Sequence, residues 1–281
     1  MAFGLAGYWW VAALGMSMKV GSLCTGYGGL EMGLQQAFGD IDLQFVSDID
    51  KNVNTLLQHH HPNISNLGDL TTVDWETVNE IDLLCAGYPC QPFSIAGERK
   101  GEEDERAIFG YIAEGISVLR PRWVLLENVS GHLTLGGTCV VGALTRLGYN
   151  DCRWGIVQAS DAGAPHKRSR LFIWAQTADT SSKRLQRLRT KRELGTWQES
   201  QHTAWDSYEP CIRRWERITN RPAPVPTEAK GVRPEFVEWM MGLPEGHVTG
   251  IGLSRKAALE ILGNGVVPQQ AALAVELLTT L

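Results

Sequence analysis

The chain has 281 residues, a mass of 31.0 kDa and a formal net charge of −5, and 43% of its residues are hydrophobic. Such a composition is typical of one large globular domain or of a main domain with a small second one. It excludes a disordered tail protein, a collagen-like chain and a disulfide-stabilised miniprotein. Six cysteines without C-x-x-C spacing indicate neither a zinc site nor a disulfide framework. We therefore expect no bound metal and a reduced, cytoplasmic setting.

The first 17 residues are apolar and aromatic and carry no charge. This stretch is too short for a membrane-spanning helix, and it lacks the cationic start of a signal peptide. We interpret residues 1–17 as an upstream extension or a loose apolar arm, with Met16 and Met18 as alternative start sites, and we expect no membrane association.

From residue 18 to residue 176, short apolar runs alternate with helical patterns. Strands are predicted at 19–23, 43–47, 81–85, 123–126, 153–158 and 170–174, and helices at 30–38, 52–60 and 108–119. Strands that alternate with crossover helices predict an α/β fold with a mostly parallel sheet and helices on both faces. Helical periodicity returns at 234–241, 257–262 and 269–281, so we expect residues 234–281 to rejoin the main domain.

Residues 177–233 break this order. They contain 12 Lys and Arg against 7 Asp and Glu, together with Trp197, Trp205, Trp215 and a proline cluster at 222–226. A local basic patch is sufficient for phosphate binding, so the segment predicts a small second unit that contacts nucleic acid. The alternative is a solvated basic surface whose tryptophans pack a local core.

The first candidate motif is the glycine-rich turn at residues 21–29, which follows the first predicted strand. Asp48 and Asp50 follow the second strand. Glycines allow a ligand to approach the backbone closely, and a carboxylate at this place accepts hydrogen bonds from ribose hydroxyls. The turn is not G-x-G-x-x-G, so a dinucleotide is not favoured over another adenosine cofactor. A tight turn that only packs a helix is the alternative.

Two further motifs follow buried strands. Cys90 lies between Pro89 and Pro92 directly after the strand at 81–85, where a rigid loop can present a thiolate. Glu127 ends the strand at 123–126, where burial raises the pKa of a carboxyl group and suits it to acid chemistry. Taken singly, Cys90 is equally consistent with a small buried hydrophobe and Glu127 with a helix cap or a surface residue.

Together and in this order, the motifs resemble those of the C5-cytosine DNA methyltransferases of prokaryotic or phage type. The matching segments are Gly26–Gly29, Asp48–Asp50, Gly68–Asp69, Pro89–Gln91, Glu127–Val129, Arg168–Arg170 and Gly263–Val267. The resemblance implies a Rossmann-like methyltransferase domain formed by residues 18–176 and 234–281, with a small target-recognition domain at 177–233. It also implies S-adenosylmethionine as the cofactor.

The resemblance assigns a role to individual residues. The Cys90 thiolate would add to carbon 6 of cytosine, Glu127 would protonate ring N3, and Arg168 and Arg170 would hold the base and keep Cys90 ionised. Cofactor contacts are expected at Cys24, Gly26, Tyr27, Gly28, Gly29, Asp48, Ile49, Asp69, Leu70, Pro89, Ile108, Asn264 and Val266. Nucleic-acid contacts are expected at Gln91, Ser94, Arg187 and Arg189.

Four positions depart from the family pattern. Cys24 and Ile49 stand where aromatic residues usually cover the cofactor, Asp48 replaces the commoner Glu, and His166 replaces Gln before the arginines. Less aromatic contact area predicts a modest cofactor affinity.

The expected function is transfer of a methyl group to carbon 5 of a cytosine that is flipped out of double-stranded DNA. A tRNA cytosine-5 methyltransferase of the same family and a catalytically silent nucleic-acid-binding relative remain open. The resemblance further implies a monomer in the cytoplasm of a bacterial or phage-infected cell, with or without a restriction endonuclease partner. The sequence does not indicate the target site.

Overall fold

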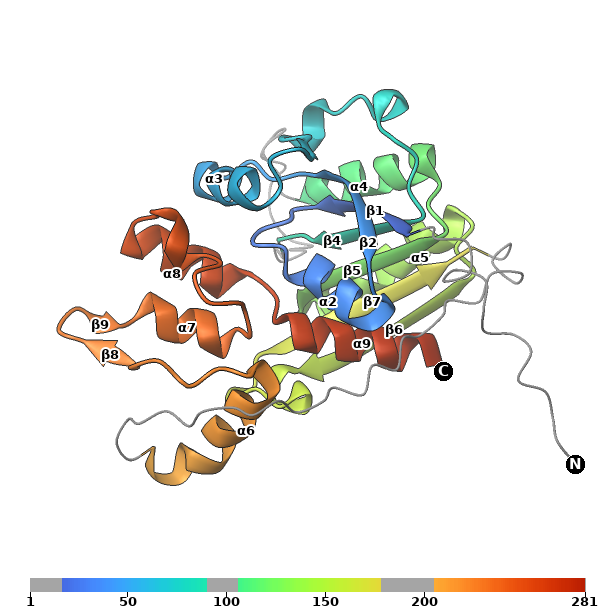
Figure 1. Ribbon diagram of the computed structural model, residues 1–281. Coiled ribbons are helices and arrows are strands. Elements are labelled where there is room, and N and C mark those ends of the chain that lie inside the picture. The colour runs from blue at the N-terminus through green and yellow to red at the C-terminus, as the bar shows by residue number, and fades with distance from the viewer. Residues whose placement is uncertain (1–16, 90–105, 178–204, 281) are drawn as a thin grey trace, which may run out of the picture.

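The computed structural model describes residues 17–89, 106–177 and 205–280 (Figure 1). The strands are β1 (Met18–Leu23), β2 (Ile41–Val46), β3 (Ser65–Asn66), β4 (Leu83–Gly87), β5 (Trp123–Val129), β6 (Asp151–Gln158), β7 (Ser169–Gln176), β8 (Thr227–Glu228) and β9 (Gly231–Val232). The helices are α2 (Gly29–Phe38), α3 (Lys51–His60), α4 (Arg106–Leu119), α5 (Thr138–Arg146), α6 (Glu209–Thr219), α7 (Pro234–Met240), α8 (Arg255–Asn264) and α9 (Pro268–Thr280).

Seven of these strands form one sheet in the order β3-β2-β1-β4-β5-β7-β6. Neighbours pair in parallel from β3 to β5, whereas β7 runs antiparallel to both β5 and β6. The predicted α/β fold with a mostly parallel sheet is confirmed. Its register places Glu127 of β5 beside Gly87 of β4, and Val129 of β5 beside Arg170 of β7.

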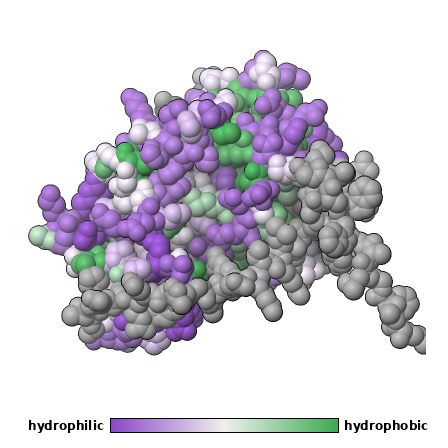
Figure 2. Space-filling view, in the orientation of Figure 1, coloured by the Kyte–Doolittle hydropathy of each residue, from purple (hydrophilic) through white to green (hydrophobic). Residues whose placement is uncertain are grey.

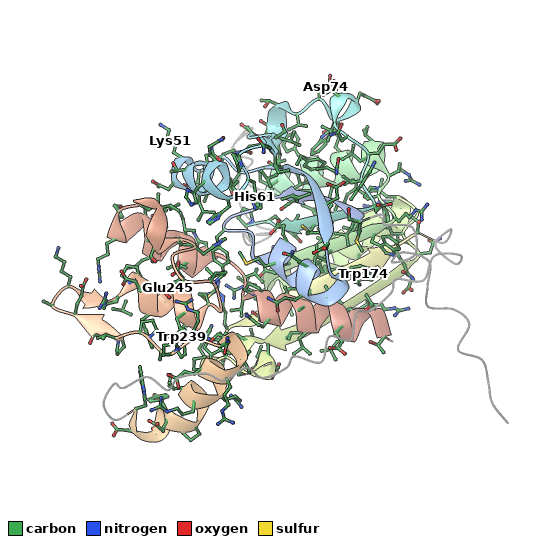
Figure 3. The ribbon with its side chains drawn as sticks, in the orientation of Figure 1. Lys51, His61, Asp74, Trp174, Trp239 and Glu245 are labelled. Atoms are coloured by element: carbon green, nitrogen blue, oxygen red, sulfur yellow. The ribbon has the colours of Figure 1, made fainter. Side chains whose placement is uncertain are left out.

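Helices cover both faces of this sheet (Figure 1). On one face, α2 and α9 pack over a core that includes Val20, Leu83 and Trp174. Trp174 is fully buried beneath these helices (Figure 3). On the other face, α4 and α5 pack over a second core that includes Leu84 and Leu126. The continuous apolar runs of the central strands reflect this burial on both sides.

A third core lies beside the sheet and joins α3, α6, α7 and α8. Trp215 of α6 is fully buried, and its indole Nε1 donates to the carbonyl oxygen of Trp239, 2.8 Å away. Trp205 stacks on Phe236 with ring centroids 5.9 Å apart. Trp197 lies outside the described residues. The described part of 177–233 thus shares a core with 234–281, across the boundary expected at residue 233, because its two described tryptophans pack against α7.

Most predicted elements are present, with ends displaced by a few residues. The sequence did not predict β3, α5, α6 or the β8–β9 hairpin. The apolar residues of α6 recur with helical spacing, but they stand among charged residues in a segment interpreted as a basic surface.

The face of the molecule in Figure 2 is mainly hydrophilic, with hydrophobic side chains in small patches. Among the described helices, none is long and apolar enough to cross a bilayer. The same residues contain no cluster of three or more potential metal ligands.

Candidate active site

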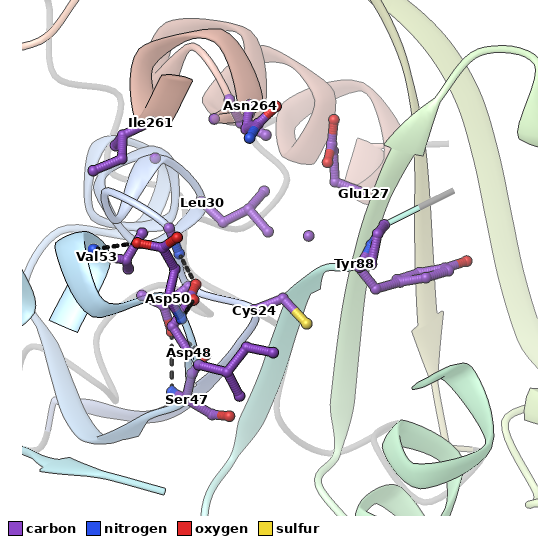
Figure 4. Close-up of a pocket in the computed structure, with 18 of the residues that line it drawn as sticks. Cys24, Leu30, Ser47, Asp48, Asp50, Val53, Tyr88, Glu127, Ile261 and Asn264 are labelled. Atoms are coloured by element: carbon purple, nitrogen blue, oxygen red, sulfur yellow. Dashed lines mark hydrogen bonds between the residues drawn. The ribbon is translucent and has the colours of Figure 1, made fainter. Parts of the chain in front are cut away.

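A cavity of about 540 Å³ opens at the carboxyl edge of β1, β2, β4 and β5 (Figure 4). This size and this position at the strand ends are typical of ligand sites in α/β proteins. Its walls come from the glycine loop after β1, the acidic turn after β2, the turn at 68–70, the ends of β4 and β5, and the segment 263–266 between α8 and α9.

The glycine loop turns sharply because three of its residues adopt positive φ angles. Cys24, Gly26 and Gly28 have φ angles of 50°, 57° and 85°. Cys24 adopts this conformation although it carries a side chain, which indicates that the surrounding structure imposes it. Gly29 begins α2, and a Cβ atom there would lie 2.2 Å from the carbonyl oxygen of Val266. The loop and the α8–α9 segment therefore touch through backbone atoms.

The acidic turn is bound to the glycine loop. Asp48 Oδ2 accepts a hydrogen bond from the Gly26 amide at 3.0 Å, and Oδ1 accepts one from the Asp50 amide at 3.0 Å. Asp50 caps α3, because its Oδ1 accepts from the amides of the first turn of that helix. Burial raises the pKa of the Asp48 carboxyl group. Ile49, between the two carboxylates, lines the cavity with 71% of its surface exposed.

Glu127 and Arg170 form a buried ion pair at the other end of the cavity. Arg170 Nε lies 2.9 Å from Glu127 Oε1, and the two side chains are 15% and 7% exposed. Burial raises the pKa of Glu127 to about 7, while the positive charges of Arg170 and Arg168 oppose this shift. A carboxyl group with such a pKa gains and loses a proton near neutral pH, as an acid or base catalyst must.

The residue after Glu127 positions the chain that leads to the predicted nucleophile. Asn128 Nδ2 donates to the carbonyl oxygen of Tyr88 at 3.0 Å, and the hydroxyl group of Tyr88 lies 3.0 Å from His132 Nε2. Pro89 follows and lines the cavity. Cys90 lies outside the described residues.

The segment 263–266 is held from two sides. The Tyr27 hydroxyl donates to the carbonyl oxygen of Val266 at 2.7 Å. Arg168 Nη2 donates to the carbonyl oxygens of Gly263 at 2.8 Å and Gly265 at 2.5 Å. Arg168 itself has a φ angle of 34°. Its guanidinium group therefore supports the segment between α8 and α9, which differs from the base contact that the resemblance implied.

The structure brings most of the expected residues together around this one cavity. The residues that line it are Cys24, Gly26, Gly29, Asp48, Ile49, Asp69, Leu70, Pro89, Ile108, Asn264 and Val266 of the expected cofactor set, and Glu127 and Arg170 of the expected catalytic set. Tyr27 and Gly28 are not among its walls; the Tyr27 side chain is buried in the core instead. Gln91, Ser94, Arg187 and Arg189, like Cys90, lie outside the described residues.

Several lining residues carried no signal in the sequence. Thr25, Ser47, Glu260 and Ile261 also face the cavity. His247, from the turn after α7, lies with its Nε2 atom 2.8 Å from the carbonyl oxygen of Tyr27, to which it donates. In the sequence, only their position next to a motif indicates that Thr25 and Ser47 belong to the site. His247 is far from the glycine loop in the sequence and reaches it only in the folded chain.

A family model described as C-5 cytosine-specific DNA methylase matches residues 18–223. The chain belongs to this family. The match begins at the start of β1, includes every motif up to Arg170, and continues through α6.

Two relatives illustrate the similarity to other members of the family. The chain is 36% identical over 161 residues to the Type II methyltransferase M.NlaX of Neisseria lactamica, covering 55% of this chain and 51% of the relative. It is 32% identical over 164 residues to M.Bsp6I of a Bacillus species, covering 56% and 51%. The chain thus spans about half the length of the curated relatives it matches.

Solved structures confirm the fold. Dnmt2 methyltransferase of S. pombe superposes with a TM-score of 0.67 at 19% identity, covering 94% of this chain and 98% of that one. The methyltransferase EhMeth of Entamoeba histolytica gives 0.60 at 16% identity, with coverages of 94% and 98%. The chain therefore has the Rossmann-like methyltransferase fold.

Proposed function

We propose that the chain is an S-adenosylmethionine-dependent DNA cytosine-5 methyltransferase with Cys90 as its nucleophile. One observation carries this proposal: a single cavity joins the acidic turn of Asp48 and the turn of Asp69 at one end to the buried Glu127–Arg170 pair at the other. A cofactor end and a base end that share one cavity are what methyl transfer between two bound molecules requires.

The cavity suits a cationic ligand. Among the described lining residues, the carboxylates are Asp48, Asp50, Asp69, Glu127 and Glu260, and the one cationic side chain is Arg170. Their summed charge favours a ligand that bears sulfonium and ammonium groups. When bound, S-adenosylmethionine supplies an electrophilic methyl group. Asp48 is placed to accept hydrogen bonds from a ribose, and the exposed Ile49 to cover an adenine.

The base end supplies the proton chemistry. Cytosine carbon 5 is a weak nucleophile, so the Cys90 thiolate adds to carbon 6 and raises the electron density at carbon 5. Glu127, whose pKa is about 7, donates a proton to N3 as the negative charge develops there. Methyl transfer would leave S-adenosylhomocysteine. The proton at carbon 5 then leaves to a base, the carbon–sulfur bond breaks and N3 returns its proton to Glu127, which releases the Cys90 thiolate and restores the aromatic ring.

The two arginines divide their tasks. Arg170 pairs with Glu127 and orients it toward the base. Arg168 acts as a positioning residue, because its guanidinium group holds the carbonyl oxygens of Gly263 and Gly265 beside the cofactor end of the cavity.

Transfer of a tritiated methyl group tests the proposal. The wild-type chain should label duplex DNA, and Cys90→Ser should abolish labelling, since a serine hydroxyl group is not ionised near neutral pH without a dedicated base. Labelling of tRNA but not of DNA would assign the RNA-modifying function instead. No labelling of either would identify a silent nucleic-acid-binding relative, and an active Cys90→Ser variant would place the nucleophile elsewhere. The names of the relatives favour a modification role beside a restriction endonuclease.

A further inference from the structure

Three buried hydroxyl-bearing residues, Ser22, Thr25 and Ser47, are linked by hydrogen bonds beneath the cavity, and the link from Thr25 to Ser47 runs through the Ser47 backbone amide (the hydroxyl chain). Thr25 Oγ1 lies 3.0 Å from Ser22 Oγ and accepts a hydrogen bond from the Ser47 amide at 3.1 Å. Ser47 Oγ donates to the carbonyl oxygen of Gly68 at 2.8 Å. Ser22, Thr25 and Ser47 are 1%, 8% and 1% exposed. Hydrogen bonds of this kind persist in the folded state because water does not compete for them.

This hydroxyl chain joins the three turns that form the proposed cofactor end of the cavity. Thr25 directly precedes Gly26 in the glycine loop, Ser47 directly precedes Asp48, and Gly68 directly precedes Asp69. A second backbone contact, from the Thr25 amide to the carbonyl oxygen of Ser47 at 3.0 Å, runs parallel to the hydroxyl chain. Hydrogen bonds between these turns therefore stabilise the glycine loop, the acidic turn and the turn at 68–70, in addition to the bonds within each turn.

Glu31 of α2 anchors the chain at its inner end. Its Oε1 atom accepts hydrogen bonds from the hydroxyl group of Ser22 and from Cys85 Sγ, and the side chain is 7% exposed. The Thr25 hydroxyl group also lies 3.3 Å from the carbonyl oxygens of Ser22 and Ser47, to either of which it can donate. Exchange of this one hydroxyl group therefore affects the contacts of Thr25 with both Ser22 and Ser47.

We propose that Thr25 and Ser47 are positioning residues that set the affinity for the adenosyl cofactor by holding the glycine loop, the acidic turn and the turn at 68–70 in the ligand-bound arrangement. The inference rests on the proposed function and adds residues that act through Gly26, Asp48 and Asp69. Turns that are already arranged for the ligand lose less conformational freedom on binding, so the gain is in affinity and not in the chemical step.

Isosteric removal of one hydroxyl group tests this role. We expect Thr25→Val to raise the dissociation constant and the KM for S-adenosylmethionine about tenfold. The kcat should stay within about twofold, because the variant loses only the arrangement of the three turns before the cofactor binds. Adenosine alone should lose affinity by the same factor. Thr25→Ser, which restores the hydroxyl group, should bind like the wild type. Ser47→Ala keeps the amide that donates to Thr25 and removes only the hydrogen bond to Gly68, so it should weaken binding by itself and further weaken Thr25→Val.

Two control variants separate this role from a general loss of stability. Val275→Ala lowers stability in the α9 core, far from the three turns, and Thr279→Val removes a hydroxyl group that donates to a helix carbonyl on α9. Both should keep wild-type affinity at temperatures below their melting transitions. Equal affinity of Thr25→Val and wild type, a Thr25→Ser variant as weak as Thr25→Val, or a matching loss in Val275→Ala would overturn the inference. A wild-type chain that binds no S-adenosylmethionine would instead overturn the proposed function, and the inference with it.

Discussion

At the scale of single residues, Glu127 makes one contribution to the pH dependence of stability. Its pKa is raised to about 7, so between about pH 4.5 and 7 the folded state holds a proton that the unfolded state has released. Protonated Glu127 contributes its full stabilisation of the folded state below pH 4.5, the ordinary pKa of a glutamate carboxyl group. This stabilisation is lost as the pH rises through 7, where the buried carboxylate must carry its charge.

Glu127→Gln should therefore raise the melting temperature more at pH 8 than at pH 5. The amide cannot ionise, so the variant avoids a cost of roughly 2–3 kcal/mol that the ionised carboxylate brings to the folded state. Thermal unfolding at both pH values measures the difference. The same variant should bind the cofactor and lose most turnover, because an amide cannot protonate N3. A difference in melting temperature that does not change with pH would show that Glu127 is ionised in the folded protein throughout this range.

A second prediction at this scale concerns Asp48 and the affinity for the cofactor. Asp48→Ala should weaken cofactor binding by about 1–3 kcal/mol, because it removes the proposed ribose acceptor and the hydrogen bond from the Gly26 amide. Titration calorimetry measures this loss. Asp42→Ala removes an exposed carboxylate from β2, the strand that precedes the acidic turn, and should leave affinity unchanged. Equal affinities of the Asp48 and Asp42 variants would refute the assignment.

At the scale of elements, the junction of α8 and α9 offers a matched pair of glycines. A Cβ atom at Gly265 would lie 1.9 Å from the ring of Tyr27, whereas one at Gly263 would meet nothing within 4 Å. Both glycines line the cavity, and both carbonyl oxygens accept from Arg168. The two positions thus differ in the space beside them and not in their place in the site.

Gly265→Ala should lower the free energy of unfolding by about 1–3 kcal/mol, because the Tyr27 ring or the junction must move. It should also weaken cofactor binding, since Val266 is held by the Tyr27 hydroxyl group. Gly263→Ala lies in the last turn of α8 and should be neutral or slightly stabilising. Chemical denaturation of both variants checks this, and equal stabilities would show that the ring does not limit the junction.

The helix α6 shows how an element can carry basic residues without offering them to a partner. Arg213 pairs with Glu209 and Glu216, and Arg214 Nε donates to the carbonyl oxygen of Gly163. Arg221, just beyond the helix, donates to the carbonyl oxygen of Leu243. Arg213 thus pairs within the helix, whereas Arg214 and Arg221 join α6 and its end to the rest of the protein. The positive charge counted from the sequence therefore overstates how many arginines of this helix are available to bind phosphate groups.

At the scale of the whole molecule, we propose that the basic residues at 183–192 contact the nucleic-acid backbone. Replacing Arg187 and Arg189 by Ala should flatten the plot of log affinity against log salt by about one to two, since each neutralised phosphate contributes a slope of roughly −0.9. The methylated sequence should stay the same, because phosphate contacts do not read bases. Binding measurements across a salt series test this.

Arg214→Ala is the control, and it should lower the melting temperature without changing the salt slope. A changed methylation sequence with an unchanged slope in the Arg187 and Arg189 variant would show that these arginines read base edges. No change in either quantity would assign them to a solvated surface.

The central fold could be predicted from the sequence because its signals are local. Continuous apolar runs predicted β1, β4 and β5, because strands that are buried on both faces of a sheet contain few polar residues. Helical periodicity of apolar residues predicted α2, α3 and α4. The family motifs further indicated which strand ends form the site. In α6, by contrast, the buried Ile212 and Trp215 recur with helical spacing, but they stand among arginines, and the segment was interpreted as a basic surface.

The sequence by itself determined the α/β class, the order of the motifs, and the candidate residues at the ends of β1, β2, β4 and β5. Only the tertiary structure decided that Arg168 serves the segment 263–265, nearly 100 residues away, and that Thr25, Ser47 and Gly68 form one hydrogen-bonded chain. The physical reason is that periodicity reports burial along one element, whereas a hydrogen bond between distant segments leaves no trace in the local sequence of either.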